Sequence, residues 1–263
     1  RAGVGPVTFL NLLHTGVRQV SVENFGSGSI SVEPGPQPDV VEGSLNASDA
    51  DFLNAVQVRQ DRDQLRLTLP QRSFGSPPTH LRLGVPAGLS FNLTTGSADV
   101  TITADIARSR VVSGSGDVSL GVASDVTCTT GSGSVSVGEL RGEGARLQTG
   151  SGDIRIGHAC CPLAAKSGSG DILVSTLQRA ELRASSGSGD ISVPSTSGSV
   201  DLRSASGSLT VGIADGLPAW LDLNSVSGSI RIALDASPEP AAGEPFVRVR
   251  GRTASGEIAV YRA

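Results

Sequence analysis

Short segments of alternating apolar and polar residues recur along most of the chain. Five copies of a small-Gly-Ser-Gly-(Asp/Ser)-apolar-x-apolar pattern lie between residues 113 and 193, and weaker copies extend it in both directions. The first apolar residue of each copy is the anchor, and the anchors are Val100, Val118, Val135, Ile154, Ile172, Ile191, Leu209, Ile230 and Ile258. Their spacing is 17–19 residues from Val100 to Leu209 and then lengthens to 21 and 28. The pattern indicates a repeat of about 18 residues.

A second pair of apolar or small positions precedes each anchor by nine and seven residues. These pairs are Phe91/Leu93, Ser109/Val111, Val126/Cys128, Ala145/Leu147, Leu163/Ala165, Leu182/Ala184, Val200/Leu202 and Leu221/Leu223. Alternation in segments this short, bounded by Gly and Ser, predicts half-buried strands. Strands of three or four residues cannot bury their apolar face alone, so the equivalent strands of successive coils must pair in a stack.

The predicted fold class is therefore all-β, a right-handed parallel β-solenoid (β-helix) with coils of about 18 residues and a β-strand N-terminal cap. The handedness follows from the strong preference of parallel crossover connections. We expect the repeated glycines to supply corners with positive φ, which other residues resist.

The two ends of the chain depart from the repeat. Residues 1–90 contain alternating segments separated by turns that carry proline and aspartate. We interpret 1–90 as a capping region continuous with the solenoid, because an open end would expose unpaired strand edges. Residues 91–263 are the solenoid repeats. Within them, 236–263 is expected to form an atypical C-terminal coil with a looped insertion at 237–245.

Composition limits the function classes. The 263 residues include 34 Gly and 14 Pro, yet 38% are hydrophobic, which is enough for a core. Aromatic residues make up only 3%, which argues against an aromatic-rich binding groove. The net charge is −4 and no basic block stands out, so we expect no nucleic-acid partner. No apolar run of about 18 residues is present, so no transmembrane segment is expected in this chain.

An acidic column immediately precedes the anchors. It consists of Asp99, Asp117, Asp153, Asp171 and Asp190. Stacked carboxylates repel each other, so a bridging cation such as Ca²⁺ is one interpretation. Calcium-binding repeats place their aspartate two residues after a glycine, however, and here serine replaces aspartate in several copies. Both side chains can accept from nearby backbone N–H groups in turns. We therefore favour a structural turn role without a cofactor, with Ca²⁺ binding as the alternative.

The cysteines do not carry a recognisable site. Cys128 occupies an inward position and is interpreted as a small core residue. Cys160 and Cys161 lie two coils further on, which is too far for a disulfide to Cys128, and a bridge between vicinal cysteines is rare. His158 could add a metal ligand in the string HACC (158–161), but no second CxxC or HxxxH accompanies it. No metal site is predicted.

Catalytic signatures are absent from the sequence. The histidines His14, His80 and His158 lie far apart, and no GxSxG, HExxH or P-loop occurs. The one route to catalysis is an acidic pair formed across coils by residues such as Asp222 or Asp201, acting as general acid and base. We predict a protein that is not an enzyme, with a polysaccharide-active β-helix enzyme as the less favoured alternative.

The outward positions are mixed. The residues between the two apolar positions of the anchor strand form no threonine ladder, which argues against an ice- or lattice-matching face. Arg155, Arg203 and Arg231 are candidates for contact with anionic glycans or other envelope polymers. Scattered arginines more commonly mark a solvated face, which is the favoured interpretation.

Three stretches carry a resemblance to a known family. The repeats such as SGSGDISV, the opening VSVENFGSGSISVEPG (20–35) and the strand THLRLGVPAGLSFNLTTGSADVTI (79–102) resemble the bacterial β-strand-repeat (GSGD-type) proteins called putative adhesins. The resemblance implies a β-helical, envelope-associated protein without an established enzymatic activity. It implies a cell-envelope or extracellular location and an envelope protein or glycan as partner. Self-association by stacking of solenoid ends is a variant of this hypothesis.

Overall fold

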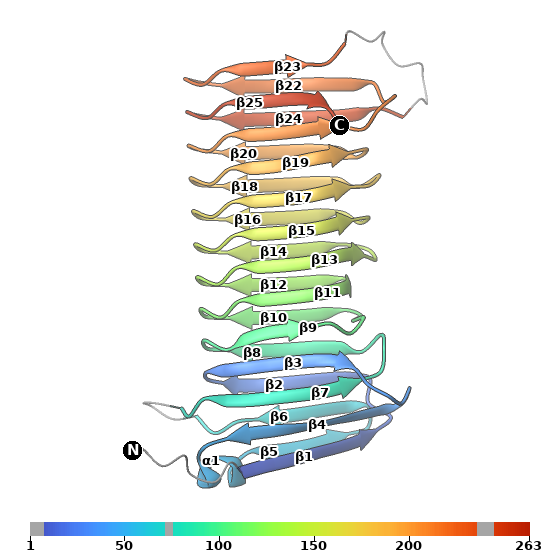
Figure 1. Cartoon of the computed structure of the whole chain (residues 1–263), viewed down its shortest axis with the longest axis vertical. Helices are drawn as coiled ribbons and strands as arrows, with labels where there is room; N and C mark the ends of the chain where they lie inside the picture. Colours follow the sequence, from blue (N-terminus) through green and yellow to red (C-terminus); the bar gives the residue numbers. More distant parts are fainter. Residues whose placement is uncertain (1–7, 72–75, 236–244) are drawn as a thin grey trace. The chain divides into compact units, whose positions relative to one another are not determined.

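The computed structural model describes residues 8–71, 76–235 and 245–263. Within these ranges nearly all regular structure is β-strand, and the one helix is the short α1 (Ala50–Asn54). The chain divides into two compact units, Arg1–Gly133 and Ser134–Ala263. Each unit contains strands of two sheets, stacked as Figure 1 shows.

The first unit contains twelve strands in its described part. They are β1 (Thr8–Thr15), β2 (Gln19–Phe25), β3 (Gly28–Pro34), β4 (Val40–Ala47), β5 (Gln57–Asp61), β6 (Gln64–Thr68), β7 (Thr79–Val85), β8 (Ser90–Thr95), β9 (Asp99–Ile102), β10 (Ser109–Ser113), β11 (Val118–Ser124) and β12 (Val126–Thr130). One sheet has the order β1-β4-β7-β3-β9-β11, and the other has the order β5-β6-β2-β8-β10-β12. Most neighbours are parallel, but β4 is antiparallel to both β1 and β7, and β5 is antiparallel to β6.

The second unit contains thirteen strands in its described part, and these strands pair in parallel. They are β13 (Val135–Arg141), β14 (Ala145–Thr149), β15 (Ile154–Ala159), β16 (Leu163–Ser167), β17 (Ile172–Leu177), β18 (Glu181–Ser186), β19 (Ile191–Thr196), β20 (Ser199–Ser204), β21 (Leu209–Ile213), β22 (Ala219–Ser225), β23 (Ile230–Ala233), β24 (Val247–Thr253) and β25 (Ile258–Arg262). The sheet orders are β13-β15-β17-β19-β21-β25-β23 and β14-β16-β18-β20-β24-β22.

The strand register follows the predicted repeat. Ile154 lies opposite Ile172, which lies opposite Ile191. In the other sheet, Ala165 lies between Leu147 and Ala184. These inward side chains are buried, so a thin apolar interior runs between the two sheets. The prediction of an all-β fold built from parallel solenoid coils of about 18 residues is confirmed.

The C-terminal coils are not stacked in chain order. Leu209 lies opposite Ile258 instead of Ile230, so β24 and β25 are inserted between β20/β21 and β22/β23. The outermost coil of this unit is therefore formed by β22 and β23, whereas the sequence order had placed the tail 236–263 there. The inserted coil buries Val249 and Ile258 fully, which favours a position with neighbours on both sides. Except for Pro245, the looped insertion expected at 237–245 lies outside the described residues.

The repeated glycines do not have the predicted role. Among the glycines of the described residues, positive φ occurs at Gly16, Gly28, Gly88, Gly142 and Gly216. Only Gly28 of these lies in a Gly-Ser-Gly string, at 26–28, and none lies in the Gly-Ser-Gly strings of the five repeats at 113–193. At the corners the constraint is close approach between coils, since a Cβ added to Gly170 would collide with the carbonyl oxygen of Gly152. The glycines are therefore required by the spacing of the coils, not by backbone handedness.

Buried hydroxyl groups close the same corners. Ser167 Oγ accepts from the N–H of Gly170 at 2.8 Å and donates to the carbonyl of Gly152 in the preceding coil at 3.0 Å. Ser186 repeats this arrangement one coil further on. Each hydroxyl thereby satisfies one backbone donor and one backbone acceptor inside the fold, where an unpaired polar group would be costly.

Candidate functional site

The predicted aspartate column lies along one set of corners and links successive coils. In the second unit, Asp153 Oδ1 accepts from the N–H of Asp171 at 2.9 Å, and Asp171 Oδ1 accepts from the N–H of Asp190 at 2.8 Å. Asp190 Oδ1 accepts from the N–H of Ser208 at 2.7 Å. The donor therefore belongs to the next coil and not to the same turn. Binding of Ca²⁺ along this column stays a prediction.

The first unit uses the same contact. Asp117 donates its N–H to Asp99 Oδ1 at 3.0 Å. In the second unit, Arg155 also reaches the other oxygen of Asp153 at 2.7 Å, so this carboxylate is shared between a backbone amide and a guanidinium group. These contacts give the acidic residues a stabilising role between coils in both units.

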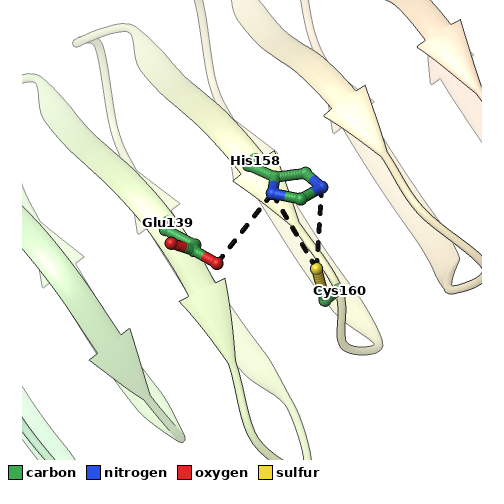
Figure 2. Close-up of side chains that lie close together, drawn as sticks. All are labelled: Glu139, His158 and Cys160. Carbon is green, nitrogen blue, oxygen red and sulfur yellow. Dashed lines mark hydrogen bonds and ion pairs between the residues drawn. The ribbon is translucent and has the colours of Figure 1, made fainter.

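Glu139, His158 and Cys160 form a cluster (Figure 2), of which the sequence drew attention to His158 and Cys160 but not to Glu139. Glu139 lies directly opposite His158 in the parallel pair β13–β15. Cys160 follows β15, and its N–H continues the ladder to the carbonyl of Leu140 at 3.0 Å. The three side chains point toward one another on the outside of this sheet, and their ligand atoms lie within 4.8 Å of one another.

The geometry of the cluster is open on the solvent side. Nδ1 of His158 lies 3.9 Å from Oε1 of Glu139 and 3.9 Å from Sγ of Cys160, while its Nε2 lies 3.6 Å from the same sulfur. Cys160 is exposed, and the side chains of His158 and Glu139 are 38% and 28% exposed. Gln178, just after β17, places its Oε1 3.8 Å from Sγ of Cys160. The cluster therefore offers one nitrogen, one sulfur and carboxylate oxygens to a common point.

Arg141 polarises the carboxylate of this cluster. Its Nε and a terminal nitrogen each donate to one oxygen of Glu139 at 2.8 Å. These hydrogen bonds hold the pKa of the Glu139 carboxyl below its ordinary value. Partial desolvation acts to raise this pKa, and the charges of Arg141 and His158 act to lower it further. Glu139 is therefore a carboxylate at neutral pH.

The remaining cysteines have different surroundings. Cys128 is fully buried, and burial raises the pKa of its thiol to about 12. Cys161 is also buried. The sequence pointed to the string HACC but not to its partner, because Glu139 lies one coil earlier. Alignment of the repeats could have indicated the pair, because Glu139 and His158 both lie four residues after an anchor.

A second surface missed from the sequence is the basic face, the outward side of β14, β16, β18, β20, β24 and β22. Its cations are Arg146, Lys166, Arg183, Arg203, Arg248, Arg250 and Arg252, and its carboxylates are Glu181, Asp201 and Asp222. These charges are separated by 15 residues or more between coils and gather only because the coils stack. Of the three arginines named from the sequence as candidates for contact with anionic polymers, Arg203 lies on this face, whereas Arg155 and Arg231 lie on anchor strands of the opposite sheet.

The basic face contains a hollow. Ala164 lies between Arg146 and Arg183 in the strand register, and its small side chain leaves a depression of about 630 Å³. Lys166 and Arg203 also line it. A neighbouring depression of the same size is lined by Arg179, Arg183, Arg248 and Arg250 among other residues. The face thus combines positive charge with concave relief.

The two candidate catalytic aspartates lie on the basic face but do not form a pair. Arg250 lies between them in the register, because β24 is inserted between β20 and β22. Asp201 accepts two hydrogen bonds from Arg203 at 3.1 Å, and Asp222 accepts one from Arg250 at 2.9 Å. Their oxygens are therefore engaged by guanidinium groups, and the general acid–base arrangement considered above is not formed.

The other histidines have local roles in the first unit. Nδ1 of His14 lies 2.8 Å from Oε1 of Gln60, and Nδ1 of His80 lies 2.9 Å from Oγ of Ser29. Both contacts are in exposed surroundings. Within the described ranges, no helix has the length and apolar character needed to span a bilayer.

Comparison with known proteins places this arrangement in a family. The family model described as toastrack DUF4097 matches residues 19–260. A crystal structure called a putative adhesin, from Parabacteroides distasonis, is 14% identical, covers 97% of each chain and has a TM-score of 0.55. A putative adhesin from Bacteroides fragilis is 18% identical, covers 96% of this chain and 97% of its own, and has a TM-score of 0.48.

The similarity to the solved structures concerns the fold. No curated protein matches the chain. The family match spans coils of both units, from the beginning of β2 to near the end of β25. This chain is a member of the toastrack DUF4097 family.

Proposed function

We propose that the chain is a non-enzymatic, adhesin-like interaction module of the bacterial cell envelope or cell exterior, and that the basic face binds an anionic glycan or a similar anionic envelope polymer. The supporting observation is the gathering of seven cations on the five neighbouring strands β14, β16, β18, β20 and β24 in a protein whose net charge is −4. The adhesin names of structures with this fold agree with a role in surface contacts.

The cations of the basic face are not equally neutralised. Arg183 pairs with Glu181 at 2.9 Å, and Arg203 pairs with Asp201 at 3.1 Å. Arg146 and Lys166 are exposed, and in the described part of the chain neither has an ion pair. They flank the depression over Ala164 from adjacent strands. A ligand with sulfate, carboxylate or phosphate groups therefore meets uncompensated charge at this point.

The opposite sheet of the same unit lacks this feature. Arg155 pairs with Asp153 at 2.7 Å, and Arg231 pairs with Glu257 at 3.1 Å. Arg141 is held by Glu139. Three of its four strand arginines are thus matched with carboxylates, and the fourth, Arg262, donates to the backbone carbonyls of Ala214 and Leu217. Attraction of an anionic polymer therefore favours the basic face.

The test compares binding of sulfated dextran and neutral dextran of the same length. We expect the wild type to bind only the sulfated polymer, with an affinity that falls as salt is raised, because exposed charges are screened. Each exposed cation contributes about 1 kcal/mol near an anionic surface, so the double variant Arg146→Ser and Lys166→Ser is expected to lose about 30-fold in affinity.

The matched control is Arg155→Ser, which removes an exposed arginine from the opposite sheet and should leave the affinity unchanged. Equal binding of the neutral polymer would contradict the proposal. Full affinity in the double variant would do so as well, since it would place the contact elsewhere.

Self-association through the end coil, β22 and β23, is a second candidate. Trp220, Val226, Ile230 and Ile232 on this coil are 49%, 81%, 42% and 54% exposed. Among the described residues, β23 and β22 are also edge strands of their sheets, so each has one row of backbone groups without a strand partner there. Apolar side chains beside open strand edges favour contact with a second copy of the same end.

Sedimentation velocity over a range of protein concentrations tests this contact. A dimer is expected to form as the concentration rises, and Ile232→Asp should abolish it, because a charge would be buried at the contact. Leu13→Asp changes a side chain on β1 that is also exposed, at 72% against 54% for Ile232, and is the control. A wild type that stays monomeric throughout would refute the self-association.

A further inference from the structure

We propose that Glu139, His158 and Cys160 form a binding site for a divalent transition metal of the Zn²⁺ type. This inference is independent of the basic face, since the cluster lies on the opposite sheet of the second unit. Its ligand set contains one thiol, one imidazole and one carboxylate. Thiolate and imidazole ligands select Zn²⁺ and related ions, whereas Ca²⁺ and Mg²⁺ prefer sites built entirely from oxygen.

The distances suit a tetrahedral ion. Bonds of about 2.3 Å to sulfur and about 2.0–2.2 Å to nitrogen and oxygen place tetrahedral ligand atoms about 3.4–3.6 Å apart. Nδ1 of His158 lies 3.9 Å from both Sγ of Cys160 and Oε1 of Glu139. A carboxylate oxygen of Glu139 and Sγ of Cys160 lie within 4.8 Å of each other, so changes of side-chain rotamer must bring the three ligand atoms closer together as the ion binds. The site then has three protein ligands and a fourth position open to water.

The backbone places these ligands without relying on a flexible loop. Glu139 and His158 are register partners in neighbouring strands, and Cys160 is held by the bond from its N–H to the carbonyl of Leu140. The strand β15, which carries His158, pairs with β13 on one side and with β17 on the other. A bound ion would therefore cross-link two successive coils, joining residues 19 positions apart in the sequence.

Binding requires loss of one proton. The thiol of Cys160 becomes a thiolate as the metal–sulfur bond forms, and the released proton passes to the solvent. Glu139 is already a carboxylate because of its hydrogen bonds from Arg141. The guanidinium of Arg141 opposes the incoming cation, however, and competes for the same carboxylate oxygens. Arg141 is therefore expected to weaken the site and to set its affinity.

The first experiment titrates the reduced full chain with Co²⁺, which occupies zinc-type sites and gives a charge-transfer absorption when bound to a thiolate. We expect a saturable band with one Co²⁺ per chain, which Zn²⁺ then removes by displacement. Cys160→Ser should abolish the band. His158→Gln and Glu139→Gln should each weaken Co²⁺ binding about tenfold or more. The His80→Gln variant is the control, since His80 bonds Ser29 in the first unit.

The second experiment uses a gain of affinity. Arg141→Ala removes a positive charge and frees the oxygens of Glu139, so Co²⁺ binding should tighten about tenfold while the absorption band keeps its shape. Circular dichroism and the Tm of each variant without metal verify that folding is intact. The proposal is overturned by the absence of a charge-transfer band in the wild type, by a band that persists in Cys160→Ser, or by weaker binding in Arg141→Ala.

Discussion

The outermost strands of the first unit and the end coil of the second unit differ in how the apolar interior between the two sheets is covered. In the first unit α1 packs against β1 and β4, and it buries Phe52 and Leu53. In the second unit the side chains of β22 and β23 that correspond to buried positions elsewhere are half-buried or exposed. A further copy of the repeat would itself expose an apolar end, whereas an added helix can cover the interior between the sheets.

The sequences of the two regions explain this contrast. Asp49 caps α1 by accepting from the N–H of Phe52 at 3.0 Å, and Phe52 is 1% exposed. Antiparallel pairing of β4 and β1 also breaks the parallel repeat next to this helix. The end coil keeps the parallel pairing and the apolar-x-apolar pattern at Ile230 and Ile232. It therefore resembles the inner coils, but within the described residues it pairs with a neighbouring coil on one side only.

The largest expected effect is at the covered end. Phe52→Ala removes a fully buried aromatic ring and should lower the free energy of unfolding by about 3–5 kcal/mol. Denaturation by urea, followed by circular dichroism, measures the change. Leu13→Ala on β1, where the side chain is 72% exposed, should cost little and serves as the control. Equal losses in the two variants would show that α1 does not cover the interior.

A matched pair of isoleucines tests the open end. Ile258 and Ile230 are register partners on adjacent strands, but Ile258 is 0% exposed and Ile230 is 42% exposed. Ile258→Ala should cost about 2–5 kcal/mol of unfolding free energy, as expected for a core position, while Ile230→Ala should cost about 1 kcal/mol or less. If urea denaturation gives similar losses, the end coil is covered in solution.

The Cys128 thiol reports on the dry interior of the first unit. Its pKa is raised to about 12 from 9.0 by burial, so the folded state keeps the proton that the unfolded state loses. Below about pH 9 the thiol is protonated in both states and does not affect the unfolding free energy. Above that pH the unfolding free energy should fall by about 1.4 kcal/mol per pH unit until about pH 12. Cys128→Ala should remove this part of the pH dependence. An identical slope in wild type and variant would indicate that water reaches the thiol.

The smallest effect is expected from calcium. The aspartate column already uses its Oδ1 atoms to accept N–H groups between coils, as at Asp171 and Asp190. We therefore expect the same Tm in EDTA and in millimolar Ca²⁺. A rise of several degrees with Ca²⁺ that is lost in Asp171→Asn would support the calcium-stabilised alternative.

Much of the fold could be predicted because the repeat acts locally. Each copy carries its own anchor and its own corner, so the spacing between Ile154 and Ile172 is enough to predict that they stack. The corner glycines were recognised, but the expected reason for them, positive φ, was wrong. Positive φ is a property of one residue, whereas the collision that excludes a side chain at Gly170 involves Gly152 in the neighbouring coil. Sequence inspection sees the first kind of constraint and not the second.

The candidate sites were harder to predict for a related reason. Glu139 and His158 are 19 residues apart, and Arg146 and Arg183 are 37 apart, so neither pairing forms a contiguous motif. Each coil advances a side chain by only one strand spacing, about 4.8 Å. Glu139 and His158 are therefore one spacing apart, and Arg146 and Arg183 are two spacings apart on either side of Ala164. Inspection of the repeat in columns on both strands would have shown the two groups. Their exposure and hydrogen bonds still depend on the side chains around them.

The sequence by itself determined the repeat, the inward positions and the parallel stacking, because a short amphipathic strand has no other way to bury its apolar side. The tertiary structure alone decided the order of the coils at the ends, where β24 and β25 insert before β22 and β23. Every coil has a similar apolar pattern, so sequence order cannot rank them. The choice depends on which coil gains most from neighbours on both sides, and the buried Val249 and Ile258 favour the inserted coil.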